Sequence, residues 1–211
     1  RDIAELYGAN VIEHAWEGFR DQKNFAIGLA THEWILSMDA DEELNEALQL
    51  SIRNFISNPK QPHTAARFSR KTFFLDEWIL HGDWYPDYII RMFRNGHGVF
   101  TGGNVHERLE VDGKIATLSG DVLHYPAESL LEFTRKNIVY ADIAAIDMFN
   151  SRKKVSVFSA LMHGCWAFLR GFIFRLGFLD GYHGYFVAKM KSFLCMYKYF
   201  KLYTLLKKGS L

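Results

Sequence analysis

The apolar run WILSM at residues 34–38 ends abruptly in the acidic run DADEE at residues 39–43. The apolar run does not alternate with polar residues, which is typical of a strand buried on both faces in a parallel sheet. In open α/β sheets, ligands bind beyond the carboxyl ends of the strands. We therefore expect an α/β fold in which Asp39 and Asp41 lie beside a binding site.

The rest of the chain predicts helices and strands around this run. Helices are expected at residues 2–7, 20–30, 44–56, 129–149, 155–174 and 185–207. Strands are expected at residues 10–13, 66–74, 88–93, 105–111, 114–118 and 121–125, with turns at Asn95-Gly96 and Asp112-Gly113. An antiparallel or mixed sheet should therefore follow the parallel part.

Charge is distributed unevenly along the 211 residues, although the formal net charge is only +1. Residues 1–150 carry 14 basic and 23 acidic side chains, whereas residues 151–211 carry 11 basic side chains and one acidic side chain, Asp180. We predict a catalytic region at 1–150 and a basic, aromatic-rich, amphipathic helical extension at 151–211. Such an extension suits an anionic membrane surface. Packing on the core with solvated lysines, and single-stranded nucleic acid binding, are the alternatives; we do not expect a nucleic acid partner.

The most apolar stretch, residues 155–169, is interrupted by His163 and Gly164 and ends at Arg170. It is shorter than the roughly 20 residues that a spanning helix needs, so we predict no transmembrane segment. The chain start has no secretory signal pattern, and its two cysteines form no CxxC motif, which favours a reducing compartment. We expect a cytoplasmic protein, peripheral on the inner face of the cytoplasmic membrane.

Asp39 and Asp41 are candidate metal ligands. Two carboxylates two residues apart can approach one hard cation, and they leave its other coordination positions for diphosphate oxygens. The alternative is that the acidic run simply complements the dipole at the start of the next helix.

Four segments of the sequence resemble segments of one known protein family. They are WEGFRDQKNFAIGLATHEWILSMDADEEL, GDWYPDYIIRMFRNGHGVFTGGNVHERL, LHYP and RLGFLDGYHGYFVAKMKSF, in that order. The chain thereby resembles family 2 glycosyltransferases of the GT-A fold, and more narrowly the lipopolysaccharide-core glucosyltransferase-like branch. The resemblance implies a Rossmann-like fold and inverting transfer of a hexose from a nucleotide-diphosphate sugar, with a UDP-hexose expected. The implied acceptor is a lipid-linked or lipopolysaccharide-core saccharide, and the implied cofactor is Mg²⁺ or Mn²⁺.

Such enzymes begin with a strand, a nucleotide-binding loop and an acidic turn. None of these precedes Arg1, so we expect a GT-A fold that lacks its first strands, in a chain truncated at its N-terminus.

Glu107 is the candidate general base, since inverting transfer needs a group that takes the proton from the acceptor hydroxyl. Residue alternation places Glu107 on the apolar face of its strand. The alternative is an ion pair with Arg91 or Arg94. By resemblance, His106 and Glu107 occupy the place where relatives carry their base motif.

The resemblance also implies roles for residues at the donor side. Lys23 and Asn24 match the helix that approaches the donor phosphates, together with Asp39, although a solvated helix face is the alternative for Lys23. His124 lies where some GT-A enzymes place a third metal ligand, although a lone histidine is more often a satisfied core or surface residue.

An aromatic loop at residues 84–87 is the candidate acceptor site. Trp84, Tyr85 and Asp87 precede a predicted strand and suit stacking on a sugar ring, although Trp84 could equally fill the core.

Two other functions stay open. A nucleotidyltransferase can share the sheet and the acidic site, and a non-catalytic membrane-surface protein could descend from a transferase.

Overall fold

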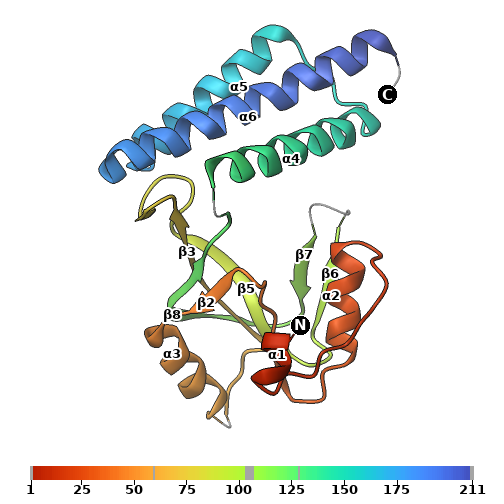
Figure 1. The fold of residues 1–211 in the computed structure, drawn as a ribbon, viewed down its shortest axis with the longest axis vertical. Helices are drawn as coiled ribbons and strands as arrows, with labels where there is room; N and C mark the ends of the chain where they lie inside the picture. Colours follow the sequence, from red (N-terminus) through yellow and green to blue (C-terminus); the bar gives the residue numbers. More distant parts are fainter. Residues whose placement is uncertain (1, 59, 103–106, 128, 210–211) are drawn as a thin grey trace.

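The computed structural model describes residues 2–58, 60–102, 107–127 and 129–209. The helices are α1 (Asp2–Leu6), α2 (Phe19–Gly28), α3 (Glu46–Ile56), α4 (Leu130–Asn150), α5 (Val157–Leu169) and α6 (Gly181–Lys208), with a π-helical turn η1 (Arg170–Phe174) and a 3-10 turn η2 (Gly177–Asp180). The strands are β1 (Trp34–Leu36), β2 (Glu42–Leu44), β3 (Ala65–Phe74), β4 (Glu77–Trp78), β5 (Asp87–Arg94), β6 (Gly98–Thr101), β7 (Arg108–Val111) and β8 (Ile115–His124). A layer of α4, α5 and α6 covers one end of the sheet (Figure 1).

The main sheet is mixed, so the predicted α/β class and the mixed sheet are both confirmed. Its strand order is β1-β5-β3-β8-β2, with β4 added to β3, while β6 and β7 form a separate hairpin. The β3–β8 pair is parallel and the other described pairs are antiparallel. The two strands expected at 114–118 and 121–125 are one strand, β8, which has an irregularity near Gly120.

The apolar run at 34–38 does not form the expected strand of a parallel sheet. Its strand, β1, has three residues, lies at the sheet edge and pairs antiparallel with β5, and Leu36 is 37% exposed. The run is apolar because Trp34 packs on Phe55 of α3, with ring centroids 5.2 Å apart. Residues 10–13, expected as a strand, form a loop.

The acidic run does not begin the next helix. Glu42 and Glu43 lie in β2, and α3 begins at Glu46 behind Asn45, whose side chain accepts a hydrogen bond from the Leu48 amide at 2.9 Å. Because an asparagine cap satisfies the helix start, the dipole alternative for the acidic run is wrong.

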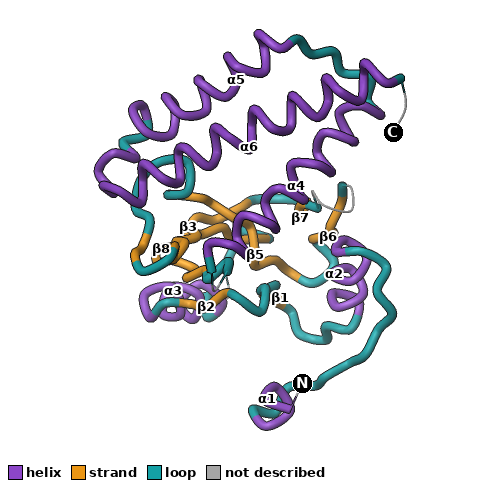
Figure 2. Tube along the Cα trace, turned by 45° about the horizontal axis from the view of Figure 1, so that its top comes forward, coloured by secondary structure: helices purple, strands orange, loops and turns teal. Residues whose placement is uncertain are grey.

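Two apolar clusters hold the layers together. The first lies between α3 and the sheet and consists of Leu48, Phe55, Ala66, Phe68, Met92 and Val122. The second joins the sheet to α4 and α6 through Phe74, Ile79, Phe133 and Val187. Helix α6 lies along both α4 and α5 (Figures 1 and 2). The helical layer therefore shares core residues with the sheet, and the domain boundary at residue 150 stays a prediction.

Helix α5 and the π-helical turn η1 together agree with the helix expected at 155–174. The helical path runs through η1 to Phe174, and the Arg170 side chain donates to Asp83 at 2.8 Å. In the described part of the chain, Val157–Phe174 is one helix that is long and apolar enough to cross a membrane, by length and composition only. The length argument against such a helix is therefore wrong.

Gly120 gives a test of the contact between β8 and α3. It has φ +102°, and a Cβ atom added there would lie 2.3 Å from the Leu48 backbone nitrogen. We expect Gly120→Ala to lower the free energy of unfolding by about 3 kcal/mol, from combined backbone strain and overpacking. Gly96→Ala, at φ +83° but in open space, is the control and should cost only about 1 kcal/mol. Urea denaturation measures both, and equal losses would contradict the close contact.

Candidate active site

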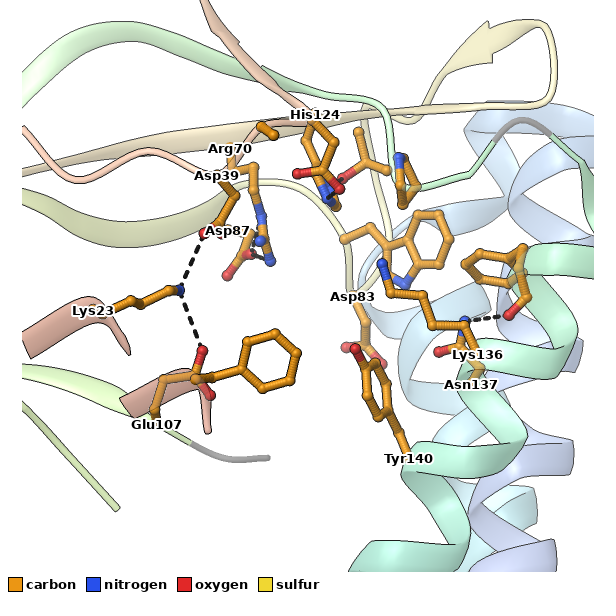
Figure 3. A pocket seen from close by; sticks show the side chains of 17 residues that line it. Lys23, Asp39, Arg70, Asp83, Asp87, Glu107, His124, Lys136, Asn137 and Tyr140 are labelled. Carbon is orange, nitrogen blue, oxygen red and sulfur yellow. Dashed lines mark hydrogen bonds and ion pairs between the residues drawn. The ribbon is translucent and has the colours of Figure 1, made fainter. Parts of the chain in front are cut away.

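A cavity of about 880 Å³ lies between the sheet and α4 (Figure 3). Side chains reach it from α2, the loop before β2, β3, the loop before β5, the start of β5, the residue before β7, the end of β8 and α4. The lining residues are Phe19, Lys23, Asp39, Ala40, Asp41, Arg70, Thr72, Asp83, Trp84, Asp87, Glu107, His124, Pro126, Phe133, Lys136, Asn137 and Tyr140. One concave site with several convergent ionisable groups is the expected form of an active site.

Most of the residues predicted for the site lie together in this cavity. Lys23, Asp39, Asp41, Trp84, Asp87, Glu107 and His124 all line it. Asn24 instead ties α2 to β6, because its amide group donates to the Phe100 carbonyl at 2.9 Å and accepts from the Phe100 amide at 2.8 Å. The Tyr85 hydroxyl donates to Asp121 at 3.2 Å, and Tyr85 is not among the lining residues. His106 lies outside the described residues.

Lys23 bridges two carboxylates that are far apart in the sequence. Its Nζ atom lies 3.1 Å from Asp39 Oδ1 and 3.2 Å from Glu107 Oε1, and its side chain is 20% exposed (Figure 3). A solvated helix face is therefore the wrong interpretation of Lys23. Glu107 does lie in an ion pair, as the alternative for it expected, but its partner is Lys23, because Arg94 pairs with Glu33 and Arg91 with Asp39. The role of Glu107 as a base stays a prediction.

Arg91 fixes the loop that carries the acidic motif. Its Nη2 atom lies 2.6 Å from Asp39 Oδ2 and 2.7 Å from Glu42 Oε1, while the Asp39 amide donates to Glu42 Oε2 at 3.1 Å. The Glu42 side chain is fully buried and that of Arg91 is 9% exposed. Burial acts to raise the pKa of Asp39, but Arg91 and Lys23 together hold that pKa below its usual range.

Asp41 and His124 meet because β2 pairs with the end of β8. The register places Glu42 opposite His124, and the Tyr125 amide donates to the Asp41 carbonyl at 2.9 Å. His124 Nε2 lies 3.5 Å from Asp41 Oδ2. Burial, followed by the charge of Arg70, lowers the pKa of His124 below its usual value, which favours the neutral imidazole that a metal needs.

Of the three metal ligands predicted from the sequence, Asp41 and His124 lie side by side, whereas Asp39 contacts Lys23 and Arg91. Among the described residues, no three His, Cys, Asp or Glu side chains come close enough to hold a metal by themselves. Both oxygens of Asp39 already face cations, whereas Asp41 and His124 offer two donors side by side. A hard divalent cation often takes only one or two protein ligands and completes its shell with substrate phosphates and water. The Asp41–His124 pair fits that arrangement.

The far wall of the cavity was not predicted from the sequence. Helix α4 contributes Lys136, Asn137 and Tyr140, which face the acidic residues across the cavity (Figure 3). Their spacing on one helical face was the signal that could have found them. Arg70 was missed as well; it lies 2.6 Å from Asp87 and 3.9 Å from Glu42.

Trp84 serves the core as well as the cavity. Its ring packs edge-on against Phe74 and Phe133, with centroids 5.4 and 5.6 Å away. The core interpretation of Trp84 is therefore supported, and its sugar-stacking role stays a prediction.

Removal of Arg91 should destabilise the whole site. Arg91→Met leaves the buried Glu42 carboxylate without its nearest cation and should lower the free energy of unfolding by roughly 3–5 kcal/mol. The matched control is Arg94→Met, whose partner Glu33 has a 65% exposed side chain, and this change should cost less than about 1 kcal/mol. Urea denaturation of both variants checks the difference, and a small loss for Arg91→Met would contradict the anchoring role.

Comparison with known proteins finds several relatives, although no family model matches the chain. An uncharacterized glycosyltransferase of Rickettsia prowazekii is 30% identical over 198 residues, which cover 87% of this chain and 66% of the relative. One of Rickettsia conorii is 28% identical over 230 residues, covering 99% of this chain and 76% of the relative. The lipopolysaccharide core biosynthesis glycosyltransferase LpsC of Rhizobium meliloti is 22% identical over 196 residues, covering 90% of this chain and 72% of the relative. The chain thus spans about two thirds of the length of the first of these relatives.

Proposed function

We propose that this chain, whose relatives support a glycosyltransferase family, transfers a hexose with inversion from a nucleotide-diphosphate sugar to a lipid-linked or lipopolysaccharide-core saccharide. The observation that carries the proposal is the Lys23 bridge, because one cation connects the acidic loop with Glu107 across the cavity. In the proposal the donor diphosphate and the acceptor base lie on either side of one reacting centre, and the Lys23 bridge would hold these two sides at a fixed separation.

The donor diphosphate belongs beside Asp41 and His124 in this proposal. These two residues would hold Mg²⁺ or Mn²⁺, which would neutralise charge on the leaving diphosphate. Lys23 and Arg70 line the same cavity and can bind phosphate oxygens. Asp39 would join the metal only by releasing Lys23 or Arg91, so its first role is to position these cations.

Glu107 is the proposed general base. Its side chain is 17% exposed and faces the cavity, and Lys23 holds one of its oxygens in place. The carboxylate would take the proton from the acceptor hydroxyl while that oxygen attacks the anomeric carbon, and the diphosphate would leave from the opposite face of the sugar. Trp84 and Tyr140 offer apolar faces on which the acceptor saccharide can stack.

The location proposed for this reaction is the inner face of the cytoplasmic membrane. The basic extension at 151–211 and the outward apolar side chains of α5 support a protein bound at the surface of an anionic bilayer.

The donor site can be tested by titration of UDP with and without Mn²⁺. The double variant Asp41→Asn, His124→Gln should lose the metal-dependent part of UDP binding, because both proposed metal ligands are changed. Asp112→Asn, His97→Gln is the matched control, since it removes another Asp–His contact of 2.7 Å in an exposed turn away from the cavity.

Equal UDP binding by both double variants would contradict the metal site. Absence of UDP binding by this chain, and also by a form extended with the residues encoded upstream of Arg1, would contradict the donor class. It would favour a nucleotidyltransferase with another nucleotide or a non-catalytic membrane-surface protein.

A further inference from the structure

Three cationic side chains converge on one buried carboxylate at the end of the cavity nearest the helical layer. Asp83 lies 2.8 Å from Arg170 Nη2, 2.9 Å from Lys191 Nζ and 3.3 Å from Arg175 Nη1. The Asp83 side chain is 2% exposed, whereas those of the three cations are 38–54% exposed. We call Arg170, Arg175 and Lys191 the cation cluster. Each cation therefore reaches inward to Asp83 and keeps part of its surface open to solvent.

The cation cluster holds more positive charge than Asp83 can compensate. Among the ion pairs of the described residues, no second carboxylate contacts any of the three cations. One carboxylate also cannot accept hydrogen bonds from all the N–H groups of two guanidinium groups and an ammonium group. Burial acts to raise the pKa of Asp83, but Arg170 and Lys191 hold it below the usual range, so the carboxylate stays charged. Two positive charges and several donors remain for an outside anion.

Close glycine packing builds this cluster. A Cβ atom on Gly177 would lie 2.6 Å from the Gly171 carbonyl oxygen, and one on Gly184 would lie 1.8 Å from the Gly177 carbonyl oxygen. The Gly82 amide donates to the Arg175 carbonyl at 2.8 Å, which ties the loop before β5 to the turn after η1. The segment RLGFLDGYHGYFVAKMKSF, for which the transfer chemistry gives no role, thus brings two of the three cations to Asp83.

Large apolar side chains lie exposed on the segments that carry the two arginines. Trp166 is 53% exposed, Leu169 45%, Ile173 45%, Phe174 65%, Phe178 45% and Leu179 56%. We call these six residues the apolar face. Two of them, Trp166 and Phe174, have ring centroids 5.6 Å apart, and exposed apolar residues gathered on neighbouring turns are typical of a contact surface. An ammonium or guanidinium group beside such a surface matches a lipid, whose phosphate lies next to its acyl chains. A nucleic acid or a free anion would leave the apolar face unused.

We propose that the cation cluster and the apolar face together bind a phosphate-bearing lipid, with the phosphate at Arg170, Arg175 and Lys191 and the acyl chains along α5 and η1. Asp83 lies between this site and the transfer cavity, because it contacts the cluster and also lines the cavity (Figure 3). This part of the inference rests on the proposed transferase function. The site would hold a lipid-linked acceptor by its phosphate, so that the saccharide reaches Trp84 and Glu107.

The test is binding of the whole chain to vesicles, measured by flotation. The vesicles contain phosphatidylcholine alone or phosphatidylcholine with phosphatidic acid. Arg175→Gln, Lys191→Gln keeps the Arg170–Asp83 contact and should weaken binding to the acidic vesicles roughly 20- to 30-fold. Lys207→Gln, Lys208→Gln removes the same charge from the exposed last turn of α6 and should have little effect. Trp166→Ser, Phe174→Ser should weaken binding to both kinds of vesicle.

Equal losses for the two charge variants would overturn the proposal, because binding would then depend on total charge and not on this cluster. Release of the protein from acidic vesicles by millimolar inorganic phosphate would also overturn it, in favour of a free-anion site. If Arg175→Gln, Lys191→Gln lowers the thermal midpoint, the single variant Arg175→Gln decides the same comparison, since that side chain is 54% exposed.

The measurements distinguish failure of the lipid site from failure of the proposed transferase function. UDP binding with unchanged vesicle binding in the cluster variant would contradict the lipid site alone. Predicted vesicle binding without any UDP binding by this chain or by its extended form would contradict the donor site alone.

Discussion

The arrangement of the cavity depends on one buried arginine. Arg91 lies between Asp39 and the fully buried Glu42, and these ion pairs fix the loop between β1 and β2. Asp39 then holds Lys23, and Lys23 holds Glu107, so that three separate parts of the chain keep one geometry. Removing a single member of a buried charge network leaves an uncompensated charge, which is why such networks specify one conformation strongly. The proposed base and the loop proposed to bind a metal are thus positioned by the same few contacts.

The sequence predicted the residues that line the cavity better than the architecture that brings them together. Asp39 and Asp41 could be named because acidic residues after an apolar run are a local pattern. Glu107 was named from strand alternation, although it lies just before β7, and His124 was named from the resemblance. The strand that was expected within a parallel sheet is an edge strand that pairs with β5, and its Trp34 packs on Phe55 of α3. Arg91 could not be identified as the partner of Asp39 because pairing over 52 positions depends on the register of β1 and β5.

The helical layer shows the same division between local pattern and tertiary contact. The ends of α4 agree with the predicted helix to within one residue, because Ser129 caps its start with a hydrogen bond to the Glu132 amide. That α4 forms a wall of the cavity could not be predicted, since it depends on Phe133 packing on Phe74 across two elements. Arg170 lies inside the helix expected at 155–174, but its contact with Asp83, 87 positions away, could not be predicted from the helical pattern. In both cases a tertiary contact determined the role of a residue whose local conformation the pattern had described.

Glu107, held by Lys23, is the proposed base for sugar transfer. The most direct measurement is single-turnover transfer from a UDP-hexose to a lipopolysaccharide-core acceptor by Glu107→Gln, compared with Glu110→Gln, whose exposed carboxylate pairs with Arg108. The account predicts that Glu107→Gln slows transfer by roughly 10²- to 10⁴-fold while UDP binding persists, and that Glu110→Gln transfers at the normal rate. Normal transfer by Glu107→Gln would contradict the account.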